Sequence, residues 1–600
     1  MNWNITRGHM RRAALLAGVT VMLLLVWTGW RAAQGLIALK HADATLSASR
    51  DLLMSDHLLI TSKQAGKELH EARASFQTPL LRLAAHVPKL GASVAEIQIL
   101  TTAADRTLNE VLLPLALSLS NDPARHLTRG SRIDVAYLSA LAAPVAEADK
   151  RMTSVAKVAT EAPQSGLKAL SSRRDAFQAQ IAKLQTGLRA LKLATTLGPT
   201  LLGATAPQNY LLIPQNPSEA RGSGGLVGGY VTLQASAGSI RQTSSGPSTL
   251  LEAFDHQVSP VVDLGQEFTR NYVNTKATRS SMGDRDPRTS WFTSNNSPHF
   301  PDTAQVWRGL WQQQTGQQVD GVLALDPVAI SYLLQATGSI NLADGTSVTS
   351  QNAVKLMMVD AYQDYGSRRV QRKAYLQEIS NAVAVALTQP GTDPRLLLSG
   401  VTRAVDEHRL QFWSAHNFVQ AQLQSTNLGG ELPGGQRGVG DVVGSAVGTK
   451  LDYYMERSLI FASSCAPTDP SRLTLTLRNA APLTGLPDYV AVPFYSGALP
   501  PGSPRGTNKS LVTIYFPASA VQPKLTLNGQ PIDALYGNER NLRRVQLLIR
   551  LEPSQQQQLQ LSFFETNTKH AEVVRIRQAL VFEEKFANIQ CPSSPAAVGN

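Results

Sequence analysis

Residues 209–233, NYLLIPQNPSEARGSGGLVGGYVTL, are the most informative stretch of this chain. Two apolar runs within it, Tyr210–Ile213 and Tyr230–Leu233, have the composition of β-strands and enclose a polar segment. Five glycines in that segment permit positive φ angles and let another group approach the backbone closely. We therefore predict two strands joined by a loop with a recognition role.

The glycine spacing does not match a nucleotide-binding loop. Val227 stands where the third glycine of G-x-G-x-x-G would fall, and a strand rather than a helix follows. Two interpretations remain: a tightly packed structural hairpin, and a loop whose Asn216, Glu219 and Arg221 contact a ligand. The planar guanidinium of Arg221 matches a phosphate or carboxylate, and an ion pair with Glu219 is the alternative.

Length and composition indicate several globular domains. The 600 residues exceed one hydrophobic core, and 43% hydrophobic with 17% charged residues is an ordinary globular composition. The formal charge of +12 indicates anionic surroundings or partners, such as lipid headgroups or cell-wall polymers. Nucleic acid is not an expected partner, because the sequence has no basic run interleaved with aromatics and no nucleic-acid-binding motif.

An apolar run near the N-terminus predicts a transmembrane anchor. Residues 13–30 carry no charge and approach the length of a spanning helix. Three arginines precede the run, so the positive-inside rule places residues 1–12 in the cytoplasm and the bulk of the chain outside it, as a single-pass protein of the cell membrane. A cleaved signal peptide is the alternative, because Ala32 and Ala33 supply small residues beyond the run.

Changes in composition divide the rest of the chain. Residues 31–200 carry apolar positions at helical spacing, which predicts a helical arm or bundle. Residues 203–428 alternate strand-like and helical runs, which predicts a layered α/β domain. A glycine-rich connector at 429–449 then leads to residues 450–595, where short alternating runs predict an antiparallel β-sandwich. The expected fold class is multidomain, α/β plus β.

Three arginines near the start of a predicted helix form a second candidate ligand site. Arg368, Arg369 and Arg372 lie at helical spacing, so two of them share a face. The helix macrodipole favours anions at that end, so uncompensated arginines there indicate a bound anion.

The segment 284–302 has the polar and aromatic composition of a functional loop. Its candidate ligand contacts are Asn295, Asn296 and His299, and turn capping by Asn and Asp residues is the alternative. No metal site is predicted, because no EF-hand-like pattern is present.

The chain has two cysteines, Cys465 and Cys591. Outside the membrane a disulfide between them is plausible and would bracket most of the last domain, whereas two separate buried thiols are the alternative. Their spacing does not match a zinc site.

Five segments occur in an order that resembles a known family. They are QNPSEARGSGGLVGGY (Gln215–Tyr230), NSPHFPDTA (Asn296–Ala304), VDGVLALDP (Val319–Pro327), the polar-aromatic stretch Tyr362–Arg372 and KLDYYMERS (Lys450–Ser458). Together they resemble an uncharacterised bacterial envelope family, the domain of unknown function four-zero-one-two, across roughly residues 203–590. The resemblance implies an anchor, a helical arm, an α/β core and a β-domain, mostly in actinobacteria and their relatives.

The α/β part has a more distant resemblance to the LytR–CpsA–Psr phosphotransferases, which move glycopolymers from polyprenyl-pyrophosphate lipids onto peptidoglycan. That family places arginines around a pyrophosphate and acids on a divalent metal. Arg221 resembles the first of those arginines, and the cluster at 368–372 resembles the later ones. Gly224, however, replaces an aspartate, and Ser244–Ala253 lacks the second Arg-Asp motif. The metal-assisted mechanism thereby loses its expected ligands.

These observations predict a membrane-anchored, extracytoplasmic cell-envelope protein. Its arginine-lined α/β site is expected to bind an anionic glycan or a polyprenyl-phosphate-linked precursor. The first alternative is a LytR-like phosphotransferase that uses a divalent metal, and the missing acids favour binding over catalysis. The second alternative is an envelope assembly partner that acts through protein contacts. No cofactor is expected outside the enzyme alternative, and the sequence does not indicate an oligomeric state.

Overall fold

The chain divides into two compact units. The computed structural model describes residues 34, 57–87, 91–118, 128–129, 132–165, 168–252, 259–273, 286–387, 392–424, 426–434, 437–464, 468–494, 497–566 and 573–589. One unit comprises Met1–Ala206 with Ser236–Ser239, and the other comprises Pro207–Ala235 with Ile240–Asn600.

Two expectations fall on residues that the structure does not describe. The apolar run 13–30, expected as a membrane anchor, lies outside the described residues, as do Cys465 and Cys591. Among the helices that are described, none combines the length and the apolar character that crossing a membrane requires. The anchor and the disulfide therefore stay predictions.

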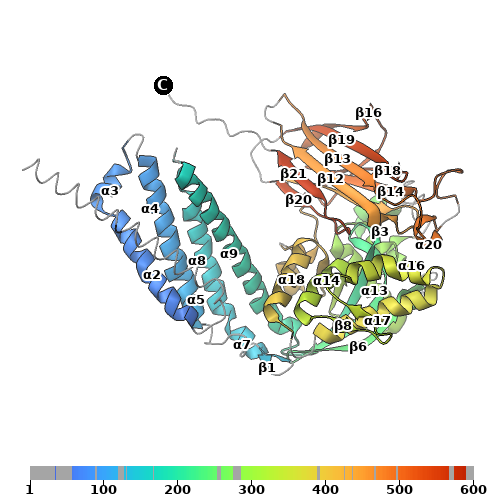
Figure 1. Ribbon diagram of the computed structural model, residues 1–600, viewed down its shortest axis with the longest axis horizontal. Coiled ribbons are helices and arrows are strands. Elements are labelled where there is room, and N and C mark those ends of the chain that lie inside the picture. The colour runs from blue at the N-terminus through green and yellow to red at the C-terminus, as the bar shows by residue number, and fades with distance from the viewer. Residues whose placement is uncertain are drawn as a thin grey trace, which may run out of the picture. The chain divides into compact units, whose positions relative to one another are not determined.

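The first unit is a bundle of helices, as the three-and-four spacing of its apolar residues predicts. Its main helices run side by side (Figure 1). They are α2 (His57–Phe76), α4 (Gly91–Arg106), α5 (Leu113–Ser118), α8 (Ala142–Thr160) and α9 (Lys168–Leu201), with a π-helical turn at Thr107–Leu112 and the shorter α3 (Pro79–Ala84) and α7 (Val135–Ala140). Its buried core joins Val111, Met152 and Ile181 from three of these segments.

The second unit begins with a mixed six-stranded sheet in the order β10-β7-β3-β5-β6, with β4 paired to β3. These strands are β3 (Gln208–Arg221), β4 (Gly224–Val227), β5 (Gly229–Ser236), β6 (Ser239–Pro247), β7 (Gly321–Leu325) and β10 (Leu410–Ser414). β3 is parallel to β7, whereas β3–β5 and β7–β10 are antiparallel pairs.

Helices cover both faces of this sheet (Figure 1). They include α10 (Ser248–Glu252), α13 (Phe300–Thr315), α14 (Pro327–Thr337), α16 (Ala361–Tyr365), α17 (Arg369–Leu387) and α18 (Pro394–Asp406). On one face, Trp307 of α13 is fully buried in the same cluster as Leu211 and Val322. On the other face, Leu325 packs beside Ile330 of α14. Adjacent strand residues point to opposite faces, so the expected α/β domain is present as layers around a sheet buried on both sides.

The C-terminal part of the second unit contains two packed sheets. One has the order β17-β18-β14-β11-β20 and the other β16-β15-β19-β13-β12-β21. The strands are β11 (Arg437–Ser445), β12 (Met455–Ala462), β13 (Ser471–Asn479), β14 (Asn508–Phe516), β15 (Ala520–Leu527), β16 (Gln530–Pro531), β17 (Leu535–Glu539), β18 (Leu542–Leu551), β19 (Gln556–Glu565), β20 (Val573–Ile576) and β21 (Lys585–Ile589).

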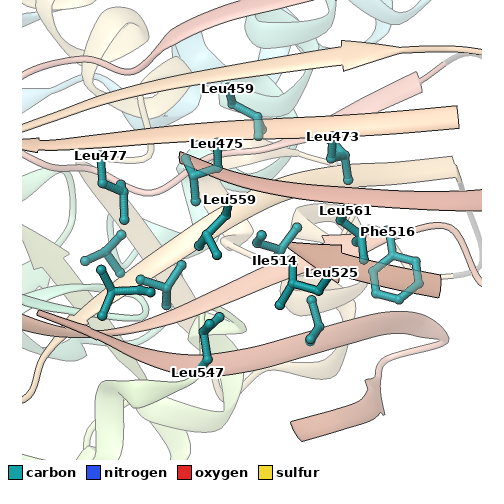
Figure 2. Packing of buried hydrophobic residues seen from close by; sticks show 14 of the residues in the cluster. Leu459, Leu473, Leu475, Leu477, Ile514, Phe516, Leu525, Leu547, Leu559 and Leu561 are labelled. Atoms are coloured by element: carbon teal, nitrogen blue, oxygen red, sulfur yellow. The ribbon is translucent and has the colours of Figure 1, made fainter. Parts of the chain in front are cut away.

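The core of this sandwich is formed by alternate residues of both sheets. Figure 2 shows leucines of β13 and β19 meeting Ile514, Phe516 and Leu547 of the opposite sheet. Alternation along β13 buries Leu473, Leu475 and Leu477 at the expected period of two. The expectation of a purely antiparallel sandwich is wrong at two edges, where β20 runs parallel to β11 and β21 runs parallel to β12.

The glycine-rich segment at 429–449 is not a simple connector. It contains β11, a strand paired on one side with β14 and on the other with β20. A Cβ at Gly440 would lie 2.5 Å from the Ile576 backbone oxygen, so glycine here permits close contact between neighbouring strands. A high glycine content therefore marks tight strand packing in this segment rather than chain flexibility.

The α/β layers and the sandwich belong to one compact unit, joined in part by Glu539. This buried carboxylate accepts hydrogen bonds from the Tyr515 hydroxyl of the sandwich at 2.6 Å, and from Tyr272 and Ser297 of the α/β part at 2.7 Å each. Burial raises the pKa of both tyrosines well above the ordinary value.

A buried charge cluster connects β11 with β12 and the residues before β21. Arg457 donates to Asp441 at 3.0 Å, and Arg575 donates to Glu584 at 3.0 Å. Burial and the nearby Asp441 carboxylate raise the pKa of Glu584 well above its ordinary value of 4.5. Above pH 4.5, Glu584 therefore keeps its proton in the folded chain and loses it in the unfolded chain. Stability is highest below pH 4.5 for this group and falls as the pH rises toward the folded-state pKa.

The variant Glu584→Gln should remove this pH dependence, because glutamine cannot ionise. We expect it to unfold at a higher temperature than the unmodified chain at pH 8, with a much smaller difference at pH 5. Scanning calorimetry at both pH values measures this. Glu583→Gln, at the exposed neighbouring position, is the matched control and should keep the original slope. Identical slopes for Glu584→Gln and the unmodified chain would show that Glu584 ionises normally in the fold.

Candidate functional site

A cavity of about 320 Å³ lies between the α/β layers and the sandwich of the second unit. β3, α10 and α17 line it from one side, and the segment from Ser445 to Phe494 lines it from the other. Five cationic and two acidic side chains face it: Arg221, Arg369, Arg372, Lys373, Lys450, Glu219 and Glu252. Cationic side chains therefore outnumber carboxylates in the lining.

Glu219 is the centre of a buried ion-pair cluster. Its Oε1 accepts from Arg221 Nη2 at 2.8 Å, and its Oε2 accepts from Lys450 Nζ. Burial opposes ionisation of Glu219, but the two cations outweigh it and hold its pKa below the ordinary value. Burial likewise opposes charge on Lys450, but Glu219 outweighs it and raises the Lys450 pKa. The pairing thus favours the charged forms of Glu219 and Lys450.

Arg221 has protein partners for each of its guanidinium nitrogens. Nε donates to the Phe292 carbonyl at 3.2 Å, Nη1 to the Ala220 carbonyl at 2.9 Å and Nη2 to Glu219. The alternative of an ion pair with Glu219 is what the structure shows. Arg221 lines the cavity, and its hydrogen bonds hold the end of β3 in place.

Arg372 is buried against two aromatic rings. Its side chain is 1% exposed, and its guanidinium carbon lies 3.8 Å from the ring centroid of Tyr489 and 4.9 Å from that of Tyr362. Nη1 donates to the Gly366 carbonyl. In the part of the chain that the structure describes, no carboxylate lies within ion-pair distance of Arg372. Ring faces partly compensate a cation, but a buried guanidinium without an acid partner retains the capacity to bind an anion.

Arg369 and Lys373 lie one helical turn apart on α17 and share one carboxylate. Glu252, the last residue of α10, accepts from Lys373 Nζ at 2.7 Å and from Arg369 Nη2 through the same oxygen, Oε1. Burial lowers the pKa of Lys373. The cavity therefore contains two carboxylates, each held by two cations, with Arg372 beside them.

Five of the predicted ligand-binding residues line this cavity: Asn216, Glu219, Arg221, Arg369 and Arg372. Asn216 donates from Nδ2 to the Tyr362 hydroxyl at 2.6 Å, which fixes one of the rings beside Arg372. Arg368 is not among the lining residues: it donates to the Asp364 carbonyl and lies over the Tyr365 ring, 5.4 Å from its centroid.

The predicted contacts from the 284–302 loop lie outside the cavity lining. Asn295 donates to the Gly225 carbonyl at 2.8 Å, and its own carbonyl accepts from the Ser223 amide at 3.1 Å. A Cβ at Gly222 would lie 2.0 Å from the oxygen of Asn296, so these asparagines and the glycine loop pack backbone to backbone.

His299 is a buried neutral imidazole. Its Nδ1 accepts from the Leu432 amide at 3.2 Å, and burial lowers its pKa to about 3. Asp302 nearby pairs with Arg540 at 2.5 Å, and burial raises the pKa of this carboxyl to about 6. The contacts of His299 hold two segments together, and none of them faces the cavity.

Four residues that line the cavity were not predicted from the sequence: Lys373, Lys450, Glu252 and Tyr489. Lys373 stands four residues after Arg369, so its helical spacing was a usable signal. Lys450 begins the segment KLDYYMERS, which resembles a family motif and carries no pattern that points to a ligand. Tyr489 and Glu252 carry no sequence pattern that points to the cavity.

A divalent metal does not fit the acidic groups of this cavity. Glu219 and Glu252, its two carboxylates, are each neutralised by two cationic side chains. Within the described parts of the chain, no group of three or more His, Cys, Asp or Glu side chains is arranged to hold a metal ion. No catalytic step through a metal is derived from these residues.

Residues 205–362 match the model of a family described as a protein of unknown function, DUF4012. Over these residues the chain is therefore similar to the family that its sequence motifs resemble. A solved structure, the Lin1025 protein from Listeria innocua, is similar over 37% of this chain and 78% of that chain, with 12% identity and a TM-score of 0.19. A similarity at that level carries no conclusion about this fold. No curated protein matches the chain.

Replacing Lys450 with methionine should destabilise the second unit by about 3 kcal/mol, because the buried Glu219 would lose one of its two cations. Chemical denaturation with guanidinium chloride measures the loss. The matched control is Lys355→Met, which breaks an exposed pair with Asp360 and should change the unfolding midpoint little. Equal effects of the two substitutions would mean that the Glu219 cluster contributes no more than a surface ion pair.

Proposed function

We propose that this chain binds a phosphate-bearing anion in the cavity between its α/β layers and its sandwich. The ligand class is an anionic glycan or a polyprenyl-phosphate-linked precursor, held by a membrane-anchored protein of the cell envelope. The observation that carries the proposal is Arg372, a buried guanidinium with two tyrosine rings beside it and no carboxylate partner among the described residues.

The charge of the lining supports an anionic ligand. Five cations face two carboxylates, and a cavity of about 320 Å³ falls in the range that small ligands occupy. Guanidinium groups match the oxygen geometry of phosphate, and such charge-assisted hydrogen bonds are strong where water is excluded. Apolar side chains, including Leu226, Met357 and Phe494, line other parts of the wall. They give a ligand with a non-ionic portion additional contact area.

Binding is proposed in preference to phosphoryl transfer. A LytR-like transferase needs acids that are free to hold a metal, and both carboxylates in this cavity are already paired with cations. The geometry supplies positive charge for holding a phosphate but no acidic pair for activating an attacking group. The charge of this cavity does not bear on the third function, an envelope assembly partner that acts through protein contacts.

The binding proposal predicts a specific loss with Arg372→Gln. Isothermal titration calorimetry of the full-length chain with pyrophosphate measures the affinity. The variant should bind pyrophosphate at least about tenfold more weakly than the unmodified chain, because one charge-assisted contact is lost. Arg368→Gln removes the same charge outside the cavity and should bind normally. Arg372→Lys keeps the charge. If circular dichroism shows that this variant is folded, it should retain part of the affinity. Absence of pyrophosphate and polyprenyl-phosphate binding by the unmodified chain would refute the proposal.

The proposed location in the membrane rests on residues 13–30 and the arginines before them. The full-length chain should sediment with membranes and resist extraction by alkaline carbonate. Deleting residues 1–30 should release it into the soluble fraction. Release of the full-length chain by carbonate would contradict an uncleaved anchor.

A further inference from the structure

We infer that Glu252 is a built-in competitor for the ligand anion, and that it restricts the cavity to ligands with at least two negative charges. The inference rests on the proposed function and names the class of ligand that the site accepts. In the chain as it stands, Glu252 occupies the clamp formed by Arg369 and Lys373. A ligand phosphate must displace this carboxylate to reach both cations.

The two carboxylates of the cavity differ in how firmly they are held. The Glu219 side chain is 9% exposed and lies within β3, a strand paired with β4, β5 and β7. The Glu252 side chain is 30% exposed and lies at the end of the five-residue helix α10. Both contacts of Glu252 use the single oxygen Oε1, at 2.7 Å from Lys373 Nζ. Glu252 can therefore rotate away without breaking a strand or exposing a buried core, whereas Glu219 cannot.

The two cations that Glu252 holds are more exposed than Arg372. The Arg369 side chain is 44% exposed, Lys373 is 13% exposed, and Arg372, on the same helix, is almost completely buried. This places a graded set of cations on α17, from the exposed Arg369 to the buried Arg372. An entering phosphate therefore meets the clamp of Arg369 and Lys373 and the acid-free Arg372 on the same helix, α17.

Charge decides which ligands can replace Glu252. A carboxylate or another monoanion offers the clamp the same charge that Glu252 already supplies, and it must also lose its freedom of movement on binding. A phosphate monoester carries a charge of about −1.5 to −2 at neutral pH, and pyrophosphate carries more. Such ligands can satisfy Arg369 and Lys373 and still provide charge for Arg372. The built-in carboxylate thus rejects weak anions, which is a form of specificity by competition.

The variant Glu252→Gln tests the inference in the full-length chain. Glutamine keeps an oxygen acceptor at the same position but removes the charge. We expect pyrophosphate to bind about tenfold more tightly to this variant than to the unmodified chain, and acetate, a monoanion, to gain measurable affinity. Glu378→Gln is the matched control: it removes the same charge from α17, and its carboxylate accepts from the Ala343 amide instead of lining the cavity. It should leave both affinities unchanged.

The possible outcomes separate this inference from the function on which it rests. If the unmodified chain binds pyrophosphate and Glu252→Gln binds it equally or less tightly, Glu252 orients the clamp and the inference is overturned. Pyrophosphate bound only by Glu252→Gln would show that a multiply charged ligand does not displace Glu252, which also overturns the inference. A tenfold gain in Glu378→Gln as well would reduce the effect to general electrostatics and overturn the inference. Failure of every variant to bind any anion would overturn both the inference and the proposed function.

Discussion

The buried carboxylate of Glu219 is the interaction on which the second unit depends. It binds Arg221 on its own strand and Lys450 between β11 and β12 of the sandwich. Two further contacts reinforce the junction: the Ala220 amide donates to Asp452 at 2.9 Å, and Gln578 donates to the Arg221 carbonyl at 2.7 Å. A buried ion pair is costly to desolvate, so it persists only where surrounding contacts fix its geometry. Here those contacts come from segments more than 200 residues apart in the chain.

The cavity is a consequence of this junction. Because β3 is held against the sandwich at its C-terminal end, the side chains of α17 and the segment around Tyr489 meet across a small space. The rings of Tyr362 and Tyr489 stack with centroids 5.8 Å apart and an interplanar angle of 16°. Arg372 lies against both rings. A cation can be buried there because aromatic faces and a backbone carbonyl replace part of its hydration.

Sequence patterns predicted elements better than they predicted contacts. Local patterns agree with the elements that contain them: apolar residues alternate with period two along β13, and α14 begins after the capping Asp326 with Pro327 at its first position. Glycine content misled at 429–449, because composition does not distinguish a flexible connector from a strand that packs closely against its neighbour. Helical spacing predicted that two of the three arginines share a face, but it did not show that these are Arg369 and Arg372 and that Arg368 points elsewhere. That choice depends on which face of α17 packs against the sheet.

The sequence by itself determined the local and repetitive features: a helical first part, alternating strands and helices, a β-rich end, and motifs that resemble a family whose model matches residues 205–362. Each of these depends on neighbouring residues or on a short period. Only the tertiary structure decided that Lys450 neutralises Glu219, that Tyr489 covers Arg372 and that Glu252 occupies the clamp on α17. Those contacts join residues distant in sequence, and long-range pairing of charges leaves no periodic trace in a single chain. The glycine-rich stretch at 209–233, in which a loop was expected between two strands, accordingly consists of the tightly packed strands β3 and β4 and most of β5, and β3 carries one wall of the cavity.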